Sequence, residues 1–200
     1  MIERDLLITY LNDYLKVAEI QDYGPQGLQV EGKAIVTKIV TGVSASLQFF
    51  ERAAAAGADM IIAHHGLLWD RETPIIKGGV KKRLETLFRH EMTLLAYHLP
   101  LDKHPEIGNN ALAARALAMT DCAEFARVGC MGSIPPCSIE ALLHVLRELY
   151  DCEPLVFAYG PPQIERVGIC SGGAERSIQE AIDLHLDAYI TGSAGEPTMH

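Results

Sequence analysis

The sequence has little positive charge compared with its negative charge. Its 17 Lys and Arg residues face 26 Asp and Glu residues, and the formal net charge of -9 repels a phosphate backbone over most of the surface. We therefore expect no general nucleic-acid binding. A single nucleotide substrate remains compatible with this charge, because metal ions in a pocket can outweigh the field of distant carboxylates.

Paired cysteine motifs and long hydrophobic runs are also missing. The five cysteines form no C-x-x-C pair, which favours reduced thiols in a cytosol. The chain opens on the charged segment 1–5 rather than on a signal peptide, and its apolar runs are shorter than the roughly 20 residues that cross a bilayer. We expect a soluble, cytoplasmic protein that makes no membrane contact.

Several common catalytic motifs are absent as well. The glycine-containing segments Gly24-Pro25-Gln26-Gly27 and Gly172-Gly173 match neither a P-loop nor a dinucleotide fingerprint, and we interpret them as turns. No G-x-S-x-G elbow occurs, and the scattered cysteines have no positional argument for nucleophilic catalysis. Covalent hydrolysis is therefore disfavoured.

The first half of the chain alternates between helical and β-rich patterns. Apolar spacing predicts helices over 4–16, 47–56, 80–90 and 110–118, and strands over 35–43, 60–63 and 93–98. Strands separated by single helices are typical of parallel βαβ units. We predict that 1–120 is the first part of an α/β domain with a layered sheet flanked by helices.

The pattern changes after this domain. A helix expected over 138–150 lies between short β-rich runs at 125–128 and 155–158. We interpret 121–165 as a small inserted α+β lobe.

The last segment returns to the earlier alternation. A strand is expected over 166–171, a helix that Ser177 caps over 178–186, and a further strand over 188–191. We predict that 166–200 resumes the α/β domain.

Two adjacent histidines supply the first candidate chemistry. Ile61-Ile62-Ala63-His64-His65-Gly66 places two imidazoles at the C-terminal end of a buried strand, where open α/β sheets form their ligand crevices. Adjacent side chains of a strand point to opposite faces, so we expect a turn at His65, which Gly66 permits. If the His64 and His65 rings diverge, each could bind one of two neighbouring metal ions.

A second polar cluster follows the next expected strand. Tyr97-His98-Leu99-Pro100-Leu101-Asp102-Lys103-His104 should lie at the same sheet edge, so the two clusters can converge. A carboxylate such as Asp102 can bridge two cations about 3.5–4 Å apart. The mixed nitrogen and oxygen donors suit zinc, manganese or iron.

Each histidine also has an ordinary structural interpretation. A lone histidine is more often a surface or satisfied core residue than a ligand, and it is the pairing of two clusters that favours a metal site. His104 has no apolar strand beside it, and we interpret it as a solvated loop residue that is structural or inert. His98 stays open between a ligand, a donor that orients a ligand and the general acid that protonates a leaving nitrogen.

Five segments recur in a characteristic order. They are Asp22-Tyr23-Gly24-Pro25-Gln26-Gly27-Leu28-Gln29-Val30, Ala63-His64-His65-Gly66, Tyr97-His98-Leu99-Pro100-Leu101-Asp102, Asn109-Asn110 and Tyr189-Ile190-Thr191-Gly192. Together they closely resemble the Nif-three-like dinuclear-metal family, whose members carry the name GTP cyclohydrolase 1 type 2 homologue. The resemblance implies that family's α/β fold and a toroid of six subunits, a homohexamer, with metal pairs facing an internal cavity.

The same resemblance implies a site and an activity. The family's histidine pair falls on His64 and His65 and its bridging aspartate on Asp102, which makes these the expected ligands of two divalent metal ions. The implied activity is dinuclear-metal-dependent hydrolysis, in which metal-bound hydroxide attacks a purine nucleotide such as GTP and His98 or a water handles protons. Two other functions stay open: a metal-dependent phosphoesterase, and a non-catalytic, ring-forming regulatory protein or metal chaperone.

The sequence departs from the family pattern near its end. The family completes its metal pair with a His and a Glu beyond the Tyr-Ile-Thr-Gly strand, and neither has a counterpart before His200. Gln26 stands where many relatives have Asn, and Ser193 where many have Glu. Three residues cannot fill the shells of two metals, so we expect a truncated chain, and its status as an enzyme depends on that.

Overall fold

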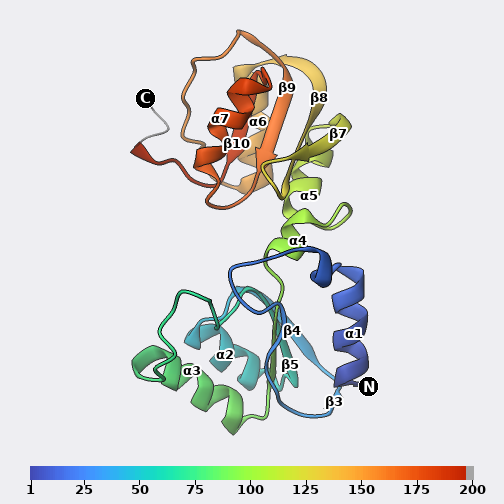
Figure 1. Ribbon diagram of the computed structural model, residues 1–200, viewed down its shortest axis with the longest axis vertical. Coiled ribbons are helices and arrows are strands. Elements are labelled where there is room, and N and C mark those ends of the chain that lie inside the picture. Colours follow the sequence, from blue (N-terminus) through green and yellow to red (C-terminus); the bar gives the residue numbers. More distant parts are fainter. Residues whose placement is uncertain (197–200) are drawn as a thin grey trace. The chain divides into compact units, whose positions relative to one another are not determined.

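The computed structural model describes residues 1–196. The chain divides into two compact units, 1–101 and 102–200, and each unit builds its own four-stranded sheet. Figure 1 shows one sheet in each of the two coloured halves of the chain.

The sheet of the first unit has the order β2-β6-β5-β4. Strands β4 (Ile39–Ser44), β5 (Met60–His65) and β6 (Thr93–Ala96) are parallel, whereas β2 (Gly27–Val30) is antiparallel to β6. The parallel strands are connected by α2 (Leu47–Ala55) and α3 (Gly78–Arg89). This confirms the two predicted βαβ units.

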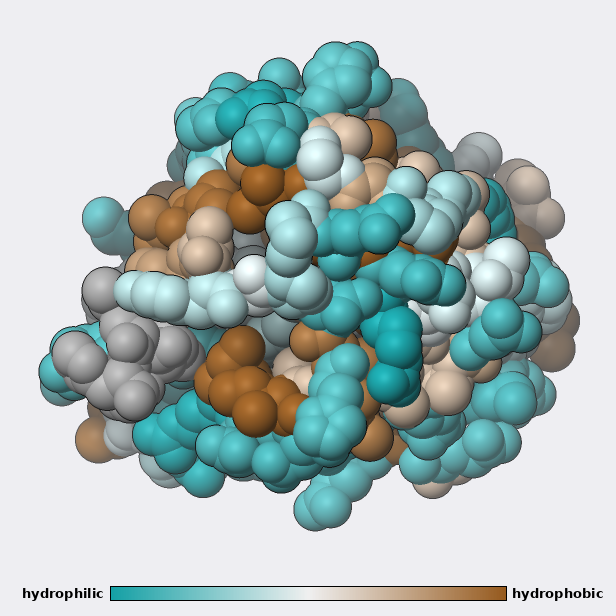
Figure 2. Space-filling view, turned by 90° about the horizontal axis from the view of Figure 1, so that it is seen from above, coloured by the Kyte–Doolittle hydropathy of each residue, from teal (hydrophilic) through white to brown (hydrophobic). Residues whose placement is uncertain are grey.

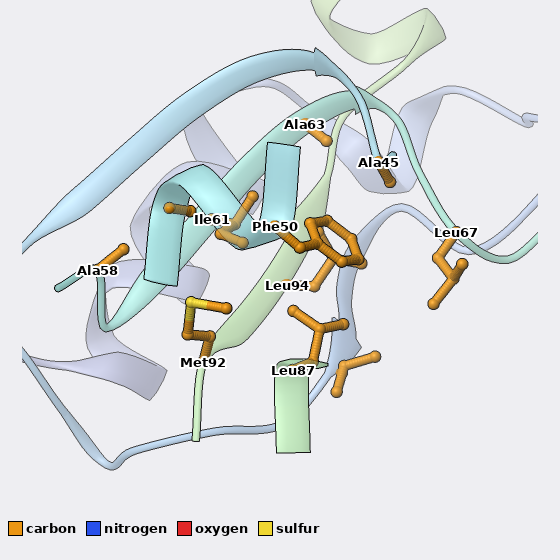
Figure 3. Packing of buried hydrophobic residues seen from close by; sticks show 11 residues of the cluster. Ala45, Phe50, Ala58, Ile61, Ala63, Leu67, Leu87, Met92 and Leu94 are labelled. Carbon is orange, nitrogen blue, oxygen red and sulfur yellow. The ribbon is translucent and has the colours of Figure 1, made fainter. Parts of the chain in front are cut away.

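Helices cover both faces of this sheet because successive strand residues alternate between the faces. On one face, Ile61 and Leu94 pack with Phe50 of α2 and Leu87 of α3 (Figure 3). On the other, Met60 and Leu95 share a cluster with apolar residues of α1 (Arg4–Tyr14). The layered α/β arrangement predicted from sequence is therefore confirmed.

Two short strands and one short helix complete the first unit. The segment expected as a single strand over 35–43 is two strands, β3 (Ile35–Val36) and β4. β3 pairs with β1 (Ile2–Glu3) in a separate two-stranded ribbon. A 3₁₀ turn, η1 (Val17–Glu19), follows α1.

The second unit has a sheet of order β10-β9-β8-β7. Its strands are β7 (Thr120–Phe125), β8 (Gly129–Ser138), β9 (Gln163–Cys170) and β10 (Ala188–Thr191), of which only β9 and β10 pair in parallel among the described residues. Helices α5 (Asn109–Ala116) and α6 (Ile139–Tyr150) pack on it in one apolar cluster. The unit also contains η2 (Glu175–Ser177) and α7 (Ile178–Asp183), and α4 (Leu99–Lys103) spans the division.

This division differs from the expected domain ranges. The strand expected to return to the first domain is β9, and it instead pairs along most of its length with β8 of the expected lobe. Hydrogen bonding therefore joins 121–165 and 166–196 in one unit with α5, and the boundary falls at residue 101 rather than 120. Residues 197–200 of the expected last segment lie outside the described part of the chain.

Three local expectations also fail for identifiable reasons. Residues 125–128 end β7 instead of starting a strand, because Ala126 and Arg127 have φ values of 49° and 68° and form a turn. Residues 155–158 form no strand, although Leu155 is apolar; its side chain is 75% exposed. The last helix ends at Asp183, shortly before His185 adopts a φ of 54°.

The surface mixes polar and apolar residues. Figure 2 shows apolar side chains reaching one face in separate patches among hydrophilic ones. Within residues 1–196, every helix falls short of the length and apolar character needed to span a bilayer.

The buried core around Phe50 gives a direct test of this fold. Phe50 is 0% exposed and lies between β5, β6 and α3. We expect Phe50→Ala to lower the free energy of unfolding by about 3–5 kcal/mol, because the substitution loses apolar contact and leaves a cavity. Urea denaturation followed by circular dichroism measures the change.

Phe88→Ala is the matched control, because Phe88 lies on α3 and is 62% exposed. It should change the unfolding free energy by no more than about 0.5 kcal/mol. Equal losses for the two variants would contradict the packing described.

Candidate metal centre

Three imidazole rings gather at one edge of the first sheet. His64 and His65 are the last residues of β5, and His98 follows β6 by two residues. The ring centroids of His64 and His65 lie 4.7 Å apart, and that of His98 lies 5.1 Å and 5.5 Å from them. One ligand nitrogen from each ring lies within 4.8 Å of the others. This is a group that can hold a metal ion.

The Nδ1 atom of each ring faces a hydrogen-bond partner. His64 Nδ1 lies 3.0 Å from the Tyr97 carbonyl oxygen, and His98 Nδ1 lies 2.9 Å from Asp22 Oδ1. A carbonyl and an ionised carboxylate only accept hydrogen bonds, so a neutral ring at either position places its proton on Nδ1 and its lone pair on Nε2. His65 Nδ1 lies 3.3 Å from the Ser44 hydroxyl, which can donate or accept.

The chain around the rings is fixed by two glutamines of the segment 22–30. Gln26 Oε1 accepts from the His98 backbone N–H at 2.6 Å. Gln29 Oε1 accepts from the backbone N–H groups of Leu67 and Leu68, at 2.7 Å and 3.2 Å. The loops after β5 and β6 are thus both held by side chains from one segment.

Gly66 is required here for space rather than for a turn. A Cβ atom at this position would lie 2.5 Å from the amide atoms of Gln29 and 2.7 Å from the Ala96 Cβ. The sequence predicted that the chain turns at His65, but β5 continues through His65 and the rings converge at the strand end.

Two aromatic side chains lie beside the histidines. The Trp69 ring centroid is 5.3 Å from that of His98 with the ring planes at 85°, and the indole N–H donates to the Gly66 carbonyl. Tyr23 is 54% exposed, and its ring centroid lies 6.4 Å from that of His98. Sequence reasoning missed both, since neither has an apolar or polar pattern that indicates the site.

Asp102 belongs to the second unit, where its side chain is held in a polar setting. Asp102 is 5% exposed, and its Oδ1 accepts from Asn109 Nδ2 at 2.6 Å and from the Ser171 hydroxyl at 3.2 Å. The buried Asn110 amide donates to the carbonyls of Asp102 and Val128. The Asn109-Asn110 pair therefore positions this aspartate, and its role as a ligand stays a prediction.

His104 differs from the expectation of a solvated loop residue. It is 8% exposed, and its Nδ1 accepts from the backbone N–H groups of Glu106 and Ile107 at 3.2 Å and 3.3 Å. The ring is buried because it satisfies these donors in a turn. His104 is a structural residue, as predicted, but not a solvated one.

Comparison with known proteins gives consistent matches. The family model described as Duf34/NIF3 (NGG1p interacting factor 3) matches residues 2–200. A protein named GTP cyclohydrolase 1 type 2 homolog from Pseudomonas aeruginosa is 41% identical over 97% of this chain and 79% of its own length. The Escherichia coli K12 protein of the same name is 41% identical over 95% of this chain and 78% of its own.

Solved structures match as well. The chain superimposes on ybgI, described as of unknown function, with a TM-score of 0.94 and 39% identity, over 100% of this chain and 81% of the other. It also superimposes on TTHA1606 from Thermus thermophilus with a TM-score of 0.90 and 35% identity, over the same shares of the two chains.

The geometry predicts that the three rings bind a divalent cation together. Zinc equilibrated with the protein and measured by plasma mass spectrometry after gel filtration should be retained by the wild type. His64→Ala, His65→Ala and His98→Ala should each weaken binding by more than the ~10–100-fold that loss of a ligand's hydrogen-bond partner causes. His90→Ala is the control, because His90 is an exposed residue at the end of α3. Equal zinc retention by all four variants would refute the cluster.

Two cysteines of the second unit, Cys130 and Cys170, should be poor nucleophiles. Burial raises the pKa of Cys130 and of Cys170 to about 11 each, so little thiolate forms at pH 8. Iodoacetamide applied to the native protein should label the exposed Cys122 and Cys152 first. Peptide mass spectrometry that finds Cys130 or Cys170 labelled equally fast would contradict this.

Proposed function

The chain belongs to the Duf34/NIF3 family, and on that premise we propose that it is a metal-dependent hydrolase of the GTP cyclohydrolase 1 type 2 kind, acting on a purine nucleotide. His64, His65 and His98 form the core of its metal centre. The single observation that carries this proposal is the convergence of three imidazoles whose Nδ1 atoms all face protein partners.

The donor set fits a divalent metal. Imidazole nitrogen suits zinc, iron and other first-row metals. Ligating histidines commonly hydrogen-bond through their second ring nitrogen to a carbonyl or a carboxylate, which fixes the tautomer and the ring orientation. His64 and His98 have these two partners, so the neutral form of each ring offers its Nε2 lone pair to a metal.

A bound divalent cation would supply Lewis acidity, lowering the pKa of a coordinated water towards about 7. The chain's own residues hold and orient the imidazoles, through the Tyr97 carbonyl, the Asp22 carboxylate and the Gln26 side chain. Tyr23 and Trp69 add aromatic rings beside them. Aromatic side chains stack on nucleobases, which supports a purine as the substrate class.

Several parts of the proposal come from the family resemblance and from the names of the relatives. They are the second metal ion, the ligand role of Asp102, the catalytic role of His98, a ring of six subunits and GTP itself. Zinc, manganese and iron are the proposed metals. Asp102→Asn, which removes one carboxylate charge, should lower the number of ions bound per chain if Asp102 is a ligand.

The activity is tested by formate release. Attack of one water on the imidazole carbon of GTP opens the ring to a formamide, and a second water hydrolyses that formamide to release the carbon as formate. Wild-type protein incubated with GTP and zinc or manganese should release formate, and His64→Ala should fall to the background without protein. His90→Ala should keep the wild-type rate, since it is exposed and outside the cluster.

Other outcomes separate the competing functions. Hydrolysis of a phosphodiester panel without formate would replace this proposal with a phosphoesterase. Metal-loaded protein that is inactive on both substrates would reject catalysis and favour a ring-forming regulatory protein or metal chaperone.

A further inference from the structure

We infer that Asp22 is a positioning residue for His98, which holds the ring in its Nδ1–H tautomer and directs the Nε2 lone pair into the metal centre. This inference rests on the metal site proposed above. Asp22 belongs to the segment Asp22–Val30, which is part of the family resemblance but had no role predicted from the sequence.

The Asp22 carboxylate is enclosed by N–H donors. Its side chain is 1% exposed, and its Oδ1 lies 2.9 Å from His98 Nδ1. The same Oδ1 accepts from the Tyr23 backbone N–H at 2.7 Å, and Oδ2 accepts from the Leu99 backbone N–H at 2.8 Å. The carboxylate cannot rotate without breaking a hydrogen bond from a backbone N–H group. The fixed orientation of the carboxylate therefore orients the imidazole.

The main chain of His98 is held from the same segment. Gln26 Oε1 accepts from the His98 N–H, while Gln26 Nε2 donates to the Gly24 carbonyl at 3.2 Å. Both the backbone and the ring of His98 are therefore fixed by residues 22–26.

The partner of His98 differs in charge from those of the other two rings. His64 faces a neutral carbonyl and His65 a hydroxyl, whereas His98 faces a carboxylate. A hydrogen bond from Nδ1 to a charged acceptor is stronger and raises the basicity of the ligating nitrogen. Asp22 should therefore strengthen metal binding through His98.

A purely structural role for Asp22 is the competing explanation. Asp22 Oδ2 also accepts from the first residue of α4, so loss of the carboxylate would disturb that turn with or without a metal. The two explanations differ in the tautomer of His98 and in whether the effect on metal binding requires the His98 ring.

The tautomer is measured in the metal-free protein by nitrogen NMR of labelled imidazoles. Wild-type His98 should show the Nδ1–H form. In Asp22→Ala, no acceptor faces Nδ1, so the preference for the Nδ1–H form should be lost and the Nε2–H form should appear. A wild-type Nε2–H tautomer, or an unchanged tautomer in the variant, overturns the inference. If the variant does not fold, the wild-type spectrum is the test: the Nδ1–H form supports the inference and the Nε2–H form overturns it.

Zinc affinity gives the second readout, in a cycle of Asp22→Asn, His98→Ala and the double variant. Asp22→Asn should weaken zinc binding ~10–100-fold, and it should have no further effect once His98 is alanine. The inference is overturned if Asp22→Asn weakens zinc binding equally with His98 and with alanine at that position, or if it does not weaken binding to the otherwise wild-type protein.

Asp59→Asn is the matched control. Asp59 also accepts two backbone N–H bonds, from Thr37 and Lys38, and its side chain is 13% exposed. It directly precedes β5, at the opposite end of that strand from His65. This variant should keep both the zinc affinity and the His98 tautomer.

Neither readout uses a substrate, so the two proposals can fail separately. If Asp22→Asn weakens zinc binding only when the His98 ring is present, and no formate is released, the hydrolase is rejected and the role of Asp22 is kept. Formate release, together with equal effects of Asp22→Asn in the presence and absence of the His98 ring, would support the hydrolase and reject the role of Asp22. A wild-type protein that binds no zinc overturns both.

Discussion

The hydrogen bonds at the Nδ1 atoms are the constraint on which the candidate site depends. A neutral imidazole has one proton, so a partner that only accepts at Nδ1 leaves a lone pair at Nε2. The Tyr97 carbonyl and the Asp22 carboxylate impose this state on His64 and His98. A shared cation would coordinate two such lone pairs at the same sheet edge.

The topology of the first sheet brings these groups to one place. Parallel strands β5 and β6 pair with Ala63 opposite Ala96, so both histidine clusters begin level with each other. Antiparallel β2 starts with Gly27 opposite Ala96, at the edge where β6 ends. The segment that precedes β2 therefore arrives beside His98, and it carries Asp22 and Gln26. One antiparallel strand added to a βαβ sheet supplies the supporting residues.

Local pattern was enough to predict the βαβ units and the approach of His98 to His64 and His65, because apolar runs and the parallel-strand rule are local signals. The pairing of strands that lie far apart in the sequence could not be predicted from local pattern. β9 has an apolar pattern that suits either sheet, so its pairing with β8 was missed. The contact between Asp22 and His98 joins residues 76 positions apart, and nothing in the spacing of the sequence indicates it.

The burial of Asp22 favours positive charge near its carboxylate. A carboxylate whose side chain is 1% exposed loses most of its hydration, a loss that hydrogen bonds offset only in part. Its donors are two backbone N–H groups and one imidazole, all formally neutral when His98 carries a single proton. The proposed divalent ion, which His98 would help to hold, would supply such a charge. Asp22 would then stabilise positive charge on the imidazole side of the site, and His98 would link the carboxylate to the metal.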